Sequence, residues 1–532
     1  MLPAALFHRN GHLLLAPRTQ QAARALLAHP RHQRRWFRAS SSCGQDEKPR
    51  PFKSQLHDST QQRMNRERSE QERFSGHHTH VSRGARSAAI TFSLVLFSAV
   101  SYYLGTQKPS SLPSTSTTPL SDLSPLEHNV SVTNLQAAWS DFVQIVGKEY
   151  VSTSSSDLTL HATSDWSSYK VKEGQKPFVV LYPSSTEEVS EIMKVCHKRR
   201  IPVTPYSGGT SLEGHYAPTR GGVCIDFGRM DQVLALHKKD LDVVVQPAIG
   251  WEGLNDILSD SGLFFPPDPG PGAMIGGMVG TGCSGTNAYR YGTMREWVLA
   301  LTVVLADGTV IKTRQRPRKS SAGYDLTRLF IGGEGTLGLV TEATLKLTVK
   351  PKNQNVAIAS FPSVYDAAEC VCRVVEDGID VAGVEILDDV QMKCINDSEA
   401  TSRRWKELPT LFFKFTGTAL GIKEQINTVQ KIVSNYKGQS FEFAKDQEEM
   451  QELWSARKEA LWSIMAMKRN PSDHVWTTDV AVPISKLAQI IEATKKDLVA
   501  SDLLAGIVGH VGDGNFHGEL HLCRFFSFFT SY

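Results

Sequence analysis

Three glycine-rich clusters, each beside a strand-like pattern, constrain the fold of this chain more than any other feature. They span Pro205–His215, Met274–Gly292 and Gly332–Gly338. Because glycine has no side chain, its backbone can approach an anion closely, and successive amides with Thr and Ser hydroxyls can bind a pyrophosphate. One such loop is usually only a turn. Three of them predict a site for a diphosphate-bearing ligand.

Two of the clusters contain the string GxGxxG, at Gly280–Gly285 and Gly333–Gly338. This string is typical of nicotinamide dinucleotide sites only where it leads from a strand into the first turn of a helix. Gly338 is instead followed by Leu339–Leu347, in which apolar and polar residues alternate as in a strand. The sequence therefore argues against a Rossmann site and favours a different diphosphate-bearing cofactor.

A globular composition begins near Leu135 with an apolar helical pattern. A βαβ unit follows, with strands predicted at Phe178–Leu181 and Ile201–Thr204 and a helix capped by Ser185 or Thr186. A second alternation of predicted strands and helices extends through the glycine clusters. After Pro351, long helical patterns alternate with strands such as Leu411–Phe415, which predicts a second α+β domain.

The N-terminal segment has the composition of a mitochondrial transit peptide, predicted over residues 1–40. Residues 1–45 contain seven arginines and no lysine, aspartate or glutamate, so this segment carries a charge of +7. The whole chain has a net charge of +3, so residues 46–532 together carry 3 minus 7, or −4. A disordered basic tail is the alternative reading. The excess of basic over acidic residues in the whole chain therefore comes from this N-terminal segment. The rest of the chain has no stretch of basic residues interleaved with aromatic ones, so we do not expect nucleic acid as a partner.

A membrane span is predicted at residues 88–105, between a polar spacer at 41–87 and a Ser/Thr/Pro-rich linker at 106–134. The 21 residues between Arg86 and Lys108 are uncharged, which is long enough to cross a bilayer. Arg83 and Arg86 precede the span, so the positive-inside rule puts the N-terminus in the matrix and the large C-terminal part across the inner membrane. The alternative is a buried core helix.

The eight cysteines include no CxxC pair and no CxxCH motif, so neither a disulfide scaffold nor a zinc ribbon is indicated. Cys370-Val371-Cys372 fits alternation along an apolar helix or strand better than a metal pair.

Near the end of the chain, His510 and His517 flank a glycine-rich turn. Such a pair can hold a cation or exchange protons, or the histidines can be incidental to the turn.

Seven segments in order resemble a known flavoprotein family. PYSGGTSLEGH, FFPPDPG, GGMVGTGCSGTNAYRYGTMREWV and GGEGTLGLVTEATL resemble the vanillyl-alcohol-oxidase-type (PCMH-type) FAD-binding fold. LWSARKEALW, TTDVAVP and GHVGDGNFH look like its FAD-linked 2-hydroxyacid branch, above all the mitochondrial D-lactate dehydrogenase (cytochrome) family. The resemblance implies an α+β architecture, with a two-subdomain FAD-binding domain at 135–350 and an antiparallel-sheet substrate (cap) domain at 351–532.

The resemblance also implies the residues of a site. Arg457 would bind the substrate carboxylate, and His510 and His517 would ligate a divalent metal, zinc or manganese, that polarises the substrate hydroxyl. His215 corresponds to a flavin-linked histidine of some relatives, although this branch usually binds FAD without a covalent bond. The implied FAD contacts are Ser207, Gly208, Gly209, Thr210, Ser211, Pro267, Asp268, Gly277, Thr281, Gly282, Gly285, Asn287, Tyr291, Glu334, Gly335 and Val340.

The implied activity is FAD-dependent oxidation of D-lactate to pyruvate, with electrons passed to cytochrome c in the intermembrane space. Oxidation of D-2-hydroxyglutarate or glycolate is one alternative. The family pattern also calls for a Glu-His-Gly motif further downstream, which residues 518–532 do not contain. We therefore expect a C-terminally truncated substrate domain. A second alternative follows, a membrane-tethered FAD-binding protein that is inactive through this truncation.

Overall fold

The computed structural model describes residues 127–172, 174–470 and 473–522, with isolated positions at 61–68 and 96–103. The chain divides into two units, Met1–Leu123 and Ser124–Tyr532. Among the described residues, no helix has the length and apolar character needed to cross a membrane. The predicted transit peptide and most of the predicted span at 88–105 lie outside the described residues.

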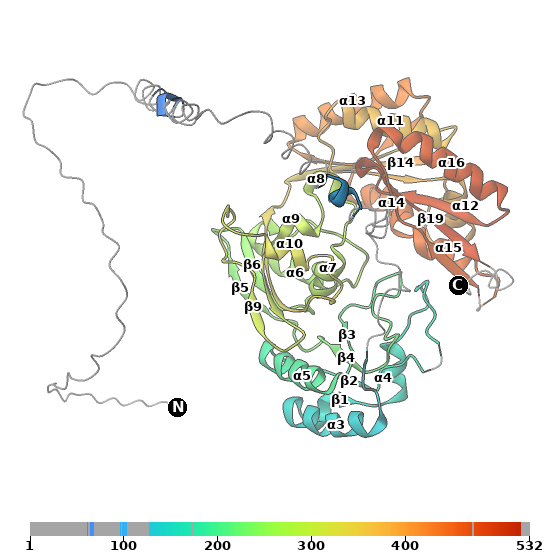
Figure 1. The fold of residues 1–532 in the computed structure, drawn as a ribbon. Coiled ribbons are helices and arrows are strands. Elements are labelled where there is room, and N and C mark those ends of the chain that lie inside the picture. Colours follow the sequence, from blue (N-terminus) through green and yellow to red (C-terminus); the bar gives the residue numbers. More distant parts are fainter. Residues whose placement is uncertain are drawn as a thin grey trace, which may run out of the picture. The chain divides into compact units, whose positions relative to one another are not determined.

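The first sheet of the second unit contains the predicted βαβ unit (Figure 1). Its order is β1-β2-β4-β3, with β2, β4 and β3 parallel and β1 antiparallel to β2. The Ser185 side chain caps the connecting helix by accepting from the Glu188 amide, which decides between the two predicted caps. The elements are α3 (Val132–Val146), β1 (Val151–Ser152), α4 (Ser155–Leu160), β2 (Val179–Leu181), α5 (Thr186–Arg199), β3 (Val203–Tyr206) and β4 (Val223–Asp226).

The second sheet is antiparallel, with the order β5-β6-β10-β8-β9. Its strands are β5 (Val233–His237), β6 (Asp242–Val245), β8 (Val298–Val304), β9 (Val310–Lys312) and β10 (Leu339–Lys346), and β7 (Leu263–Phe264) pairs with β11 (Thr348–Val349). Its helices are α6 (Trp251–Leu258), α7 (Ile275–Thr281), α8 (Ala288–Tyr291), α9 (Met294–Trp297) and α10 (Leu326–Phe330). The third glycine cluster leads directly into β10, as predicted, so its GxGxxG string does not open a helix.

The third sheet is the predicted second α+β domain, and every strand pairing recorded in it is antiparallel. Its order is β15-β12-β14-β13-β18-β19-β16, with β17 also on β19. The strands are β12 (Asn353–Ser360), β13 (Gly383–Leu387), β14 (Thr410–Gly417), β15 (Gln439–Phe443), β16 (His474–Thr477), β17 (Val480–Ala481), β18 (Ala505–Gly509) and β19 (Asn515–Leu522). The helices are α11 (Val364–Glu376), α12 (Asp389–Asp397), α13 (Ala419–Asn435), α14 (Gln447–Lys458), α15 (Ala460–Ala466) and α16 (Leu487–Ala500).

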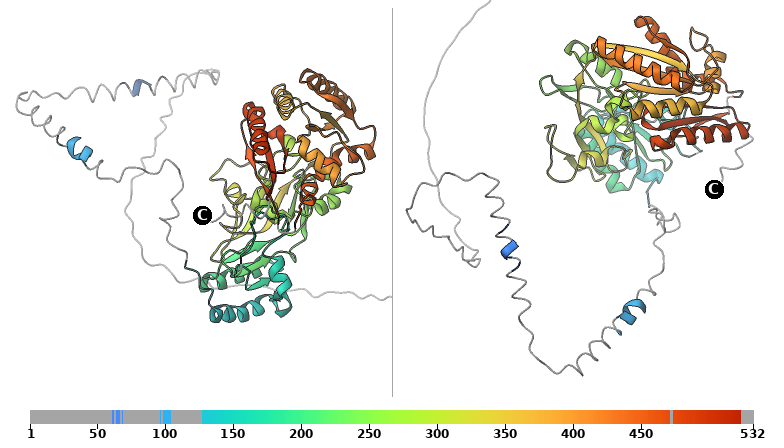
Figure 2. Two further views of the ribbon diagram at one scale, coloured as in Figure 1. Left: turned by 90° about the vertical axis from the view of Figure 1, so that its right-hand side faces the viewer. Right: turned by 90° about the horizontal axis from the view of Figure 1, so that it is seen from above.

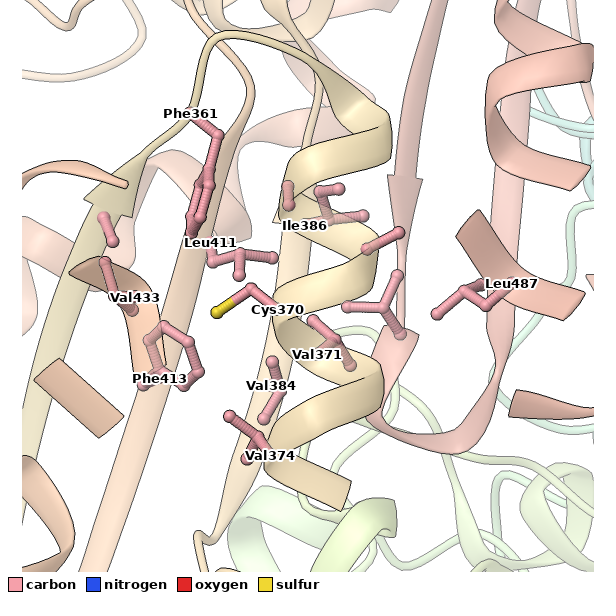
Figure 3. Packing of buried hydrophobic residues seen from close by; sticks show 14 of the residues in the cluster. Phe361, Cys370, Val371, Val374, Val384, Ile386, Leu411, Phe413, Val433 and Leu487 are labelled. Carbon is pink, nitrogen blue, oxygen red and sulfur yellow. The ribbon is translucent and has the colours of Figure 1, made fainter. Parts of the chain in front are cut away.

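Alternation along the strands gives the third sheet a separate apolar core on each face. Phe413 of β14 packs with α11, α13 and α16, whereas its neighbour Phe412 packs with α12 and α14 on the other face. Figure 3 shows the first core, with Cys370 of α11 pointing toward Leu411 and Phe413 of β14. The layers are seen from two further directions in Figure 2. Cys370 is therefore a helical core residue, as the alternation suggested.

Candidate functional site

The first two glycine clusters lie against each other. A Cβ added to Gly208 would stand 2.7 Å from the carbonyl oxygen of Gly272 and 3.1 Å from the Met274 nitrogen. These are backbone atoms, which cannot swing away as a flexible side chain can. The approach therefore requires glycine at position 208.

The third cluster contacts both of the others. The Glu334 amide donates to the Gly280 carbonyl at 2.9 Å, which joins the third cluster to the second. A Cβ on Gly335, whose φ is +76°, would meet Pro205 Cγ at 2.6 Å, at the start of the first cluster. Segments more than 120 positions apart along the chain thus converge on one place, as three parts of a single ligand site would.

The loop after β3 presents unpaired backbone donors. None of the described residues accepts a hydrogen bond from the backbone N–H groups of Gly208–Gly214, although much of this loop is only half exposed. Gly209 has φ +61°, in the left-handed region that lets successive amides turn toward one point. Consecutive amides of this kind form an anion-binding nest.

His215 links the same loop to the third cluster. Its Nδ1 is hydrogen-bonded to Ser211 Oγ, and its Nε2 lies 3.3 Å from Glu334 Oε1. Both ring nitrogens therefore have polar partners within the protein. The arrangement favours a role in holding the two loops together.

Asp268 is largely buried, with a side chain 15% exposed, and is bonded to the second cluster. The Thr286 hydroxyl donates to Oδ2 at 2.5 Å and the Asn287 amide donates to Oδ1 at 2.8 Å, while Lys414 Nζ lies 3.8 Å from Oδ2. A Cβ on Gly285 would meet Oδ1 at 2.4 Å. Burial raises the pKa of Asp268, against the opposing effect of Lys414. The Asp268 carboxylate thus holds the Thr286–Asn287 part of the second cluster in place through these hydrogen bonds.

The remaining predicted FAD contacts are divided between the loops and the core. Thr281 donates through Oγ1 to the Gly277 carbonyl at 3.0 Å at the end of α7, and Gly282 ends this helix with φ +62°. Tyr291 instead packs edge-on against Phe264, and Val340 packs against the core of the five-stranded sheet. Tyr291 is itself within the second cluster, where its amide donates to the Asn287 carbonyl at 3.0 Å, and Val340 follows the third cluster on β10.

A buried carboxylate joins two of the predicted catalytic residues. Glu385 of β13 accepts from Arg457 Nε on α14 at 2.8 Å and lies 2.8 Å from His510 Nδ1, which follows β18. Burial alone would raise the pKa of Glu385, but the charges and hydrogen bonds of His510 and Arg457 outweigh it, and the pKa is lowered. Glu385 is therefore an ionised anchor for both.

The Arg457 side chain keeps its outer nitrogens available. Glu385 uses Nε, and no hydrogen bond from either Nη atom to a described residue is recorded. The side chain is 16% exposed. A guanidinium held at Nε presents the remaining donors as a planar fork, which suits a carboxylate ligand.

The two histidines face one another across the turn between β18 and β19. Their ring centroids lie 5.8 Å apart with the planes at 90°. His510 uses Nδ1 for Glu385 and His517 uses Nδ1 for the Thr478 carbonyl at 3.1 Å, so no described residue hydrogen-bonds to either Nε2. Burial, followed by the charge of His510, lowers the pKa of His517. A neutral ring with Nδ1 donating to oxygen presents an Nε2 lone pair.

Metal binding has limited support in the described residues. They contain no group of three or more His, Cys, Asp or Glu side chains placed to hold an ion. The donor chemistry at the two Nε2 atoms nevertheless suits a borderline metal such as zinc. The structure thus supplies two candidate ligands and no third.

Two further carboxyls lie beside this region, Asp513 on an exposed residue of the turn and Glu519 buried on β19. Partial loss of solvent around the carboxyl raises the pKa of Asp513, in the turn between the histidines, to about 6, although the residue as a whole is exposed, and His510 acts in the opposite direction. Burial also raises the pKa of Glu519 on β19 to about 7, and its Oε2 has no partner among the described residues. Glu519 and His517 share one face of β19, since they stand two residues apart.

Sequence reasoning missed Glu385 and Lys414. A weak signal for each was present, because a single charged residue interrupts the apolar strands Gly383–Leu387 and Thr410–Gly417. A charge in a fully apolar strand is rarely buried without a partner. The signal does not reveal the partners, which come from other elements.

Family comparisons match both the part of the chain that carries the glycine clusters and the part that carries the third sheet. Residues 177–314 match the family described as FAD binding domain, and residues 350–522 match FAD linked oxidases, C-terminal domain. The fold also resembles the 4-ethylphenol oxidase of Gulosibacter chungangensis, with a TM-score of 0.61 and 19% identity over 75% of this chain and 84% of that one. This likeness establishes the shared fold.

Two curated relatives are much more similar in sequence. The chain is 53% identical to "D-lactate dehydrogenase [cytochrome], mitochondrial" of Kluyveromyces lactis, over 68% of this chain and 64% of the relative. It is 48% identical to "D-lactate dehydrogenase [cytochrome] 1, mitochondrial" of Saccharomyces cerevisiae, over 76% and 70%. The match thus spans about two thirds of each relative's length. On this evidence the chain belongs to the FAD-linked oxidase family that includes the mitochondrial D-lactate dehydrogenases (cytochrome).

Proposed function

We propose that this protein oxidises D-lactate to pyruvate with FAD and passes the electrons to cytochrome c. The observation that carries the proposal is Arg457, whose outer nitrogens bond to none of the described residues while Glu385 holds its Nε and also His510. This unit lies on the sheet that reaches the second glycine cluster through Lys414. A carboxylate-binding fork beside an FAD-binding domain fits a small 2-hydroxy acid. The names of the curated relatives support the same reaction.

The first glycine loop would hold the FAD diphosphate through the amides and hydroxyls of Ser207–Ser211. The unpaired donors of this loop and the convergence of three glycine clusters fit such a group. The remaining predicted contacts would surround it from the other two clusters. When bound, FAD supplies the two-electron oxidation of the substrate and the one-electron delivery to the cytochrome, which side chains cannot.

Arg457 would orient the substrate by pairing with its carboxylate, which places the C2 hydroxyl on the side of His510 and His517. Glu385 keeps the guanidinium and the His510 ring in fixed positions, so this orientation does not have to be assembled after binding. Burial keeps His517 neutral, so its Nε2 can accept a hydrogen bond from the hydroxyl or bind a cation. Buried surroundings also strengthen each of these polar contacts.

The reaction is tested by mixing purified, FAD-loaded protein with D-lactate, D-2-hydroxyglutarate or glycolate without oxygen. We expect D-lactate to bleach the flavin absorbance and the other two acids to act at least tenfold more slowly. Arg457→Lys should raise the KM for D-lactate at least tenfold, because lysine cannot form the bidentate contact. Preference for the dicarboxylate would favour the hydroxyglutarate alternative, and absence of bleaching by any acid would favour the inactive FAD-binding protein.

Gly277→Ala distinguishes a cofactor contact from a structural glycine. Apart from the chain neighbours and the backbone of its own helix, no atom of the described residues lies within 4 Å of a Cβ at this position, and alanine is the better residue inside α7 by up to about 1 kcal/mol. We expect equal or higher thermal stability of the cofactor-free protein, with FAD affinity weakened at least tenfold. Gly253→Ala in α6, where space is also open, is the matched control and should leave FAD affinity unchanged. Unchanged affinity in both variants would remove Gly277 from the site.

We further propose that His510 and His517 bind one zinc or manganese ion through their Nε2 atoms. The ion would polarise the substrate hydroxyl. We expect a metal content near one ion per chain by mass spectrometry, falling to near zero in His517→Ala. His474→Ala is the control, since this histidine lies on β16 outside the turn. A metal content that is equal in both variants would contradict the assignment.

The site would face the mitochondrial intermembrane space, where cytochrome c is available. The Arg-rich residues 1–45 and the 21 uncharged residues between Arg86 and Lys108 support import and an inner-membrane anchor with this orientation. The relatives' names support mitochondrial residence. Digestion of the catalytic domain by protease added to mitoplasts, and its protection in intact mitochondria, checks the orientation.

A further inference from the structure

Lys414 connects the substrate sheet to the second glycine cluster. It lies on β14, and its Nζ donates to Thr286 Oγ1 and to Asn287 Oδ1, each at 3.0 Å. Asp268 Oδ2 is 3.8 Å away, and the Trp454 ring centroid lies 4.6 Å from the same nitrogen. One ammonium group therefore contacts three residues of the FAD-binding domain and one of α14.

The interior position of Lys414 makes these contacts necessary. Its side chain is 19% exposed, and burial lowers its pKa while Asp268 and Glu385 act to raise it. A buried ammonium without partners would cost several kcal/mol. Two of its three donors are matched by Thr286 Oγ1 and Asn287 Oδ1, and Asp268 stands at ion-pair distance from the same nitrogen, which limits the freedom of the contact.

The contact continues into the predicted substrate site. Gly383 of β13 is the register partner of Lys414, and Glu385 is the partner of Phe412, so Lys414 and Glu385 lie on the same face of adjacent strands. Glu385 in turn holds Arg457. Charges of alternating sign, Asp268, Lys414, Glu385 and Arg457, thus lead from the glycine cluster to the guanidinium.

We propose that Lys414 is a positioning residue that fixes the FAD-binding loop at Asp268–Asn287 relative to Arg457, and so sets the geometry between cofactor and substrate. This inference rests on the proposed function for the identity of the substrate. It assigns Lys414 no contact with either molecule. Small errors in such a geometry are costly, since a displacement of about 1 Å can slow a reaction by about a hundredfold.

The test separates positioning from stability with three variants. Lys414→Met keeps the length of the side chain and removes its donors, which leaves Asp268 buried without its cation. The double variant Lys414→Met/Asp268→Asn removes that unpaired charge, and the new amide can donate to Thr286. Lys431→Met, on an exposed position of α13, is the control. The measurements on FAD-loaded full chain are melting temperature, the visible circular dichroism of bound flavin, and the rate of flavin reduction by D-lactate.

We expect Lys414→Met to lose melting temperature, to alter the flavin dichroism and to slow reduction at least tenfold. The double variant should regain melting temperature while its dichroism stays altered and its reduction stays at least tenfold slow. Recovery of rate and dichroism together with stability, or wild-type behaviour of Lys414→Met, would overturn the proposal. If the wild type is not reduced by D-lactate, the proposed function fails, and the dichroism and melting temperatures still decide the role of Lys414.

Discussion

Replacing Glu385 with alanine is expected to lower the free energy of unfolding by about 3 to 5 kcal/mol, the range for breaking a buried ion pair from one side. Glu385 is 1% exposed and anchors both Arg457 and His510, so its removal leaves a buried guanidinium without its partner. Because the pKa of Glu385 lies below its ordinary value, this stabilisation is present at neutral pH and is lost as the pH falls through the folded-state pKa. Loss of the anchor also frees Arg457 and should slow D-lactate oxidation at least a hundredfold.

Urea denaturation and D-lactate kinetics of the same preparations measure the two effects. Glu424→Ala, on an exposed position of α13, is the control and should change stability by less than about 0.5 kcal/mol. Glu385→Gln should retain more stability than alanine, because the amide oxygen can still accept one hydrogen bond, yet it should remain slow. Equal midpoints for the Glu385 and Glu424 variants would show that the carboxylate does not support its two partners.

Local patterns predicted those elements whose periodicity reflects their burial. Leu339–Lys346 alternates along β10, so a period of two was readable there. Phe412 and Phe413 are both apolar, so the sequence predicted a strand at β14, whereas the opposite cores that they face are seen only in the structure. For the N-cap of α5 the sequence left two candidates, Ser185 and Thr186, because both residue types can cap a helix by accepting from a backbone amide of its first turn. Strand order was not readable, since pairing such as β10 between β6 and β8 depends on contacts between distant segments.

The candidate site was predictable only where its residues are close in sequence. His510 and His517 come together because β18, a tight turn and β19 form a hairpin, which the glycines between them signal. Glu385 lies 125 positions from His510, and Lys414 lies 128 positions from Thr286. No local sequence pattern could predict that Glu385 contacts His510 or that Lys414 contacts Thr286. The resemblance to a family supplied Arg457, yet the carboxylate that holds it needed the fold.

Glu519 gives the second large expected effect, on the pH dependence of stability. Its folded-state pKa of about 7 lies above the ordinary value of 4.5, chiefly because of burial, so the folded state retains a proton that the unfolded state has lost. The resulting stabilisation is fully present below pH 4.5 and is lost as the pH rises through 7. A difference of about 2.5 pKa units corresponds to roughly 3 kcal/mol.

Glu519→Gln should therefore be more stable than the wild type by roughly 2 to 3 kcal/mol at pH 8.5, because its amide cannot ionise. The advantage should disappear near pH 4.5, where the wild-type carboxyl is protonated. Asp513 changes stability in the same direction and His517 in the opposite one, so only the difference between the two proteins isolates Glu519. Urea midpoints from pH 4.5 to 8.5, with EDTA to remove metal ions, measure it. Parallel curves would mean that the carboxyl reaches water in the folded state, and Glu424→Gln should give parallel curves in any case.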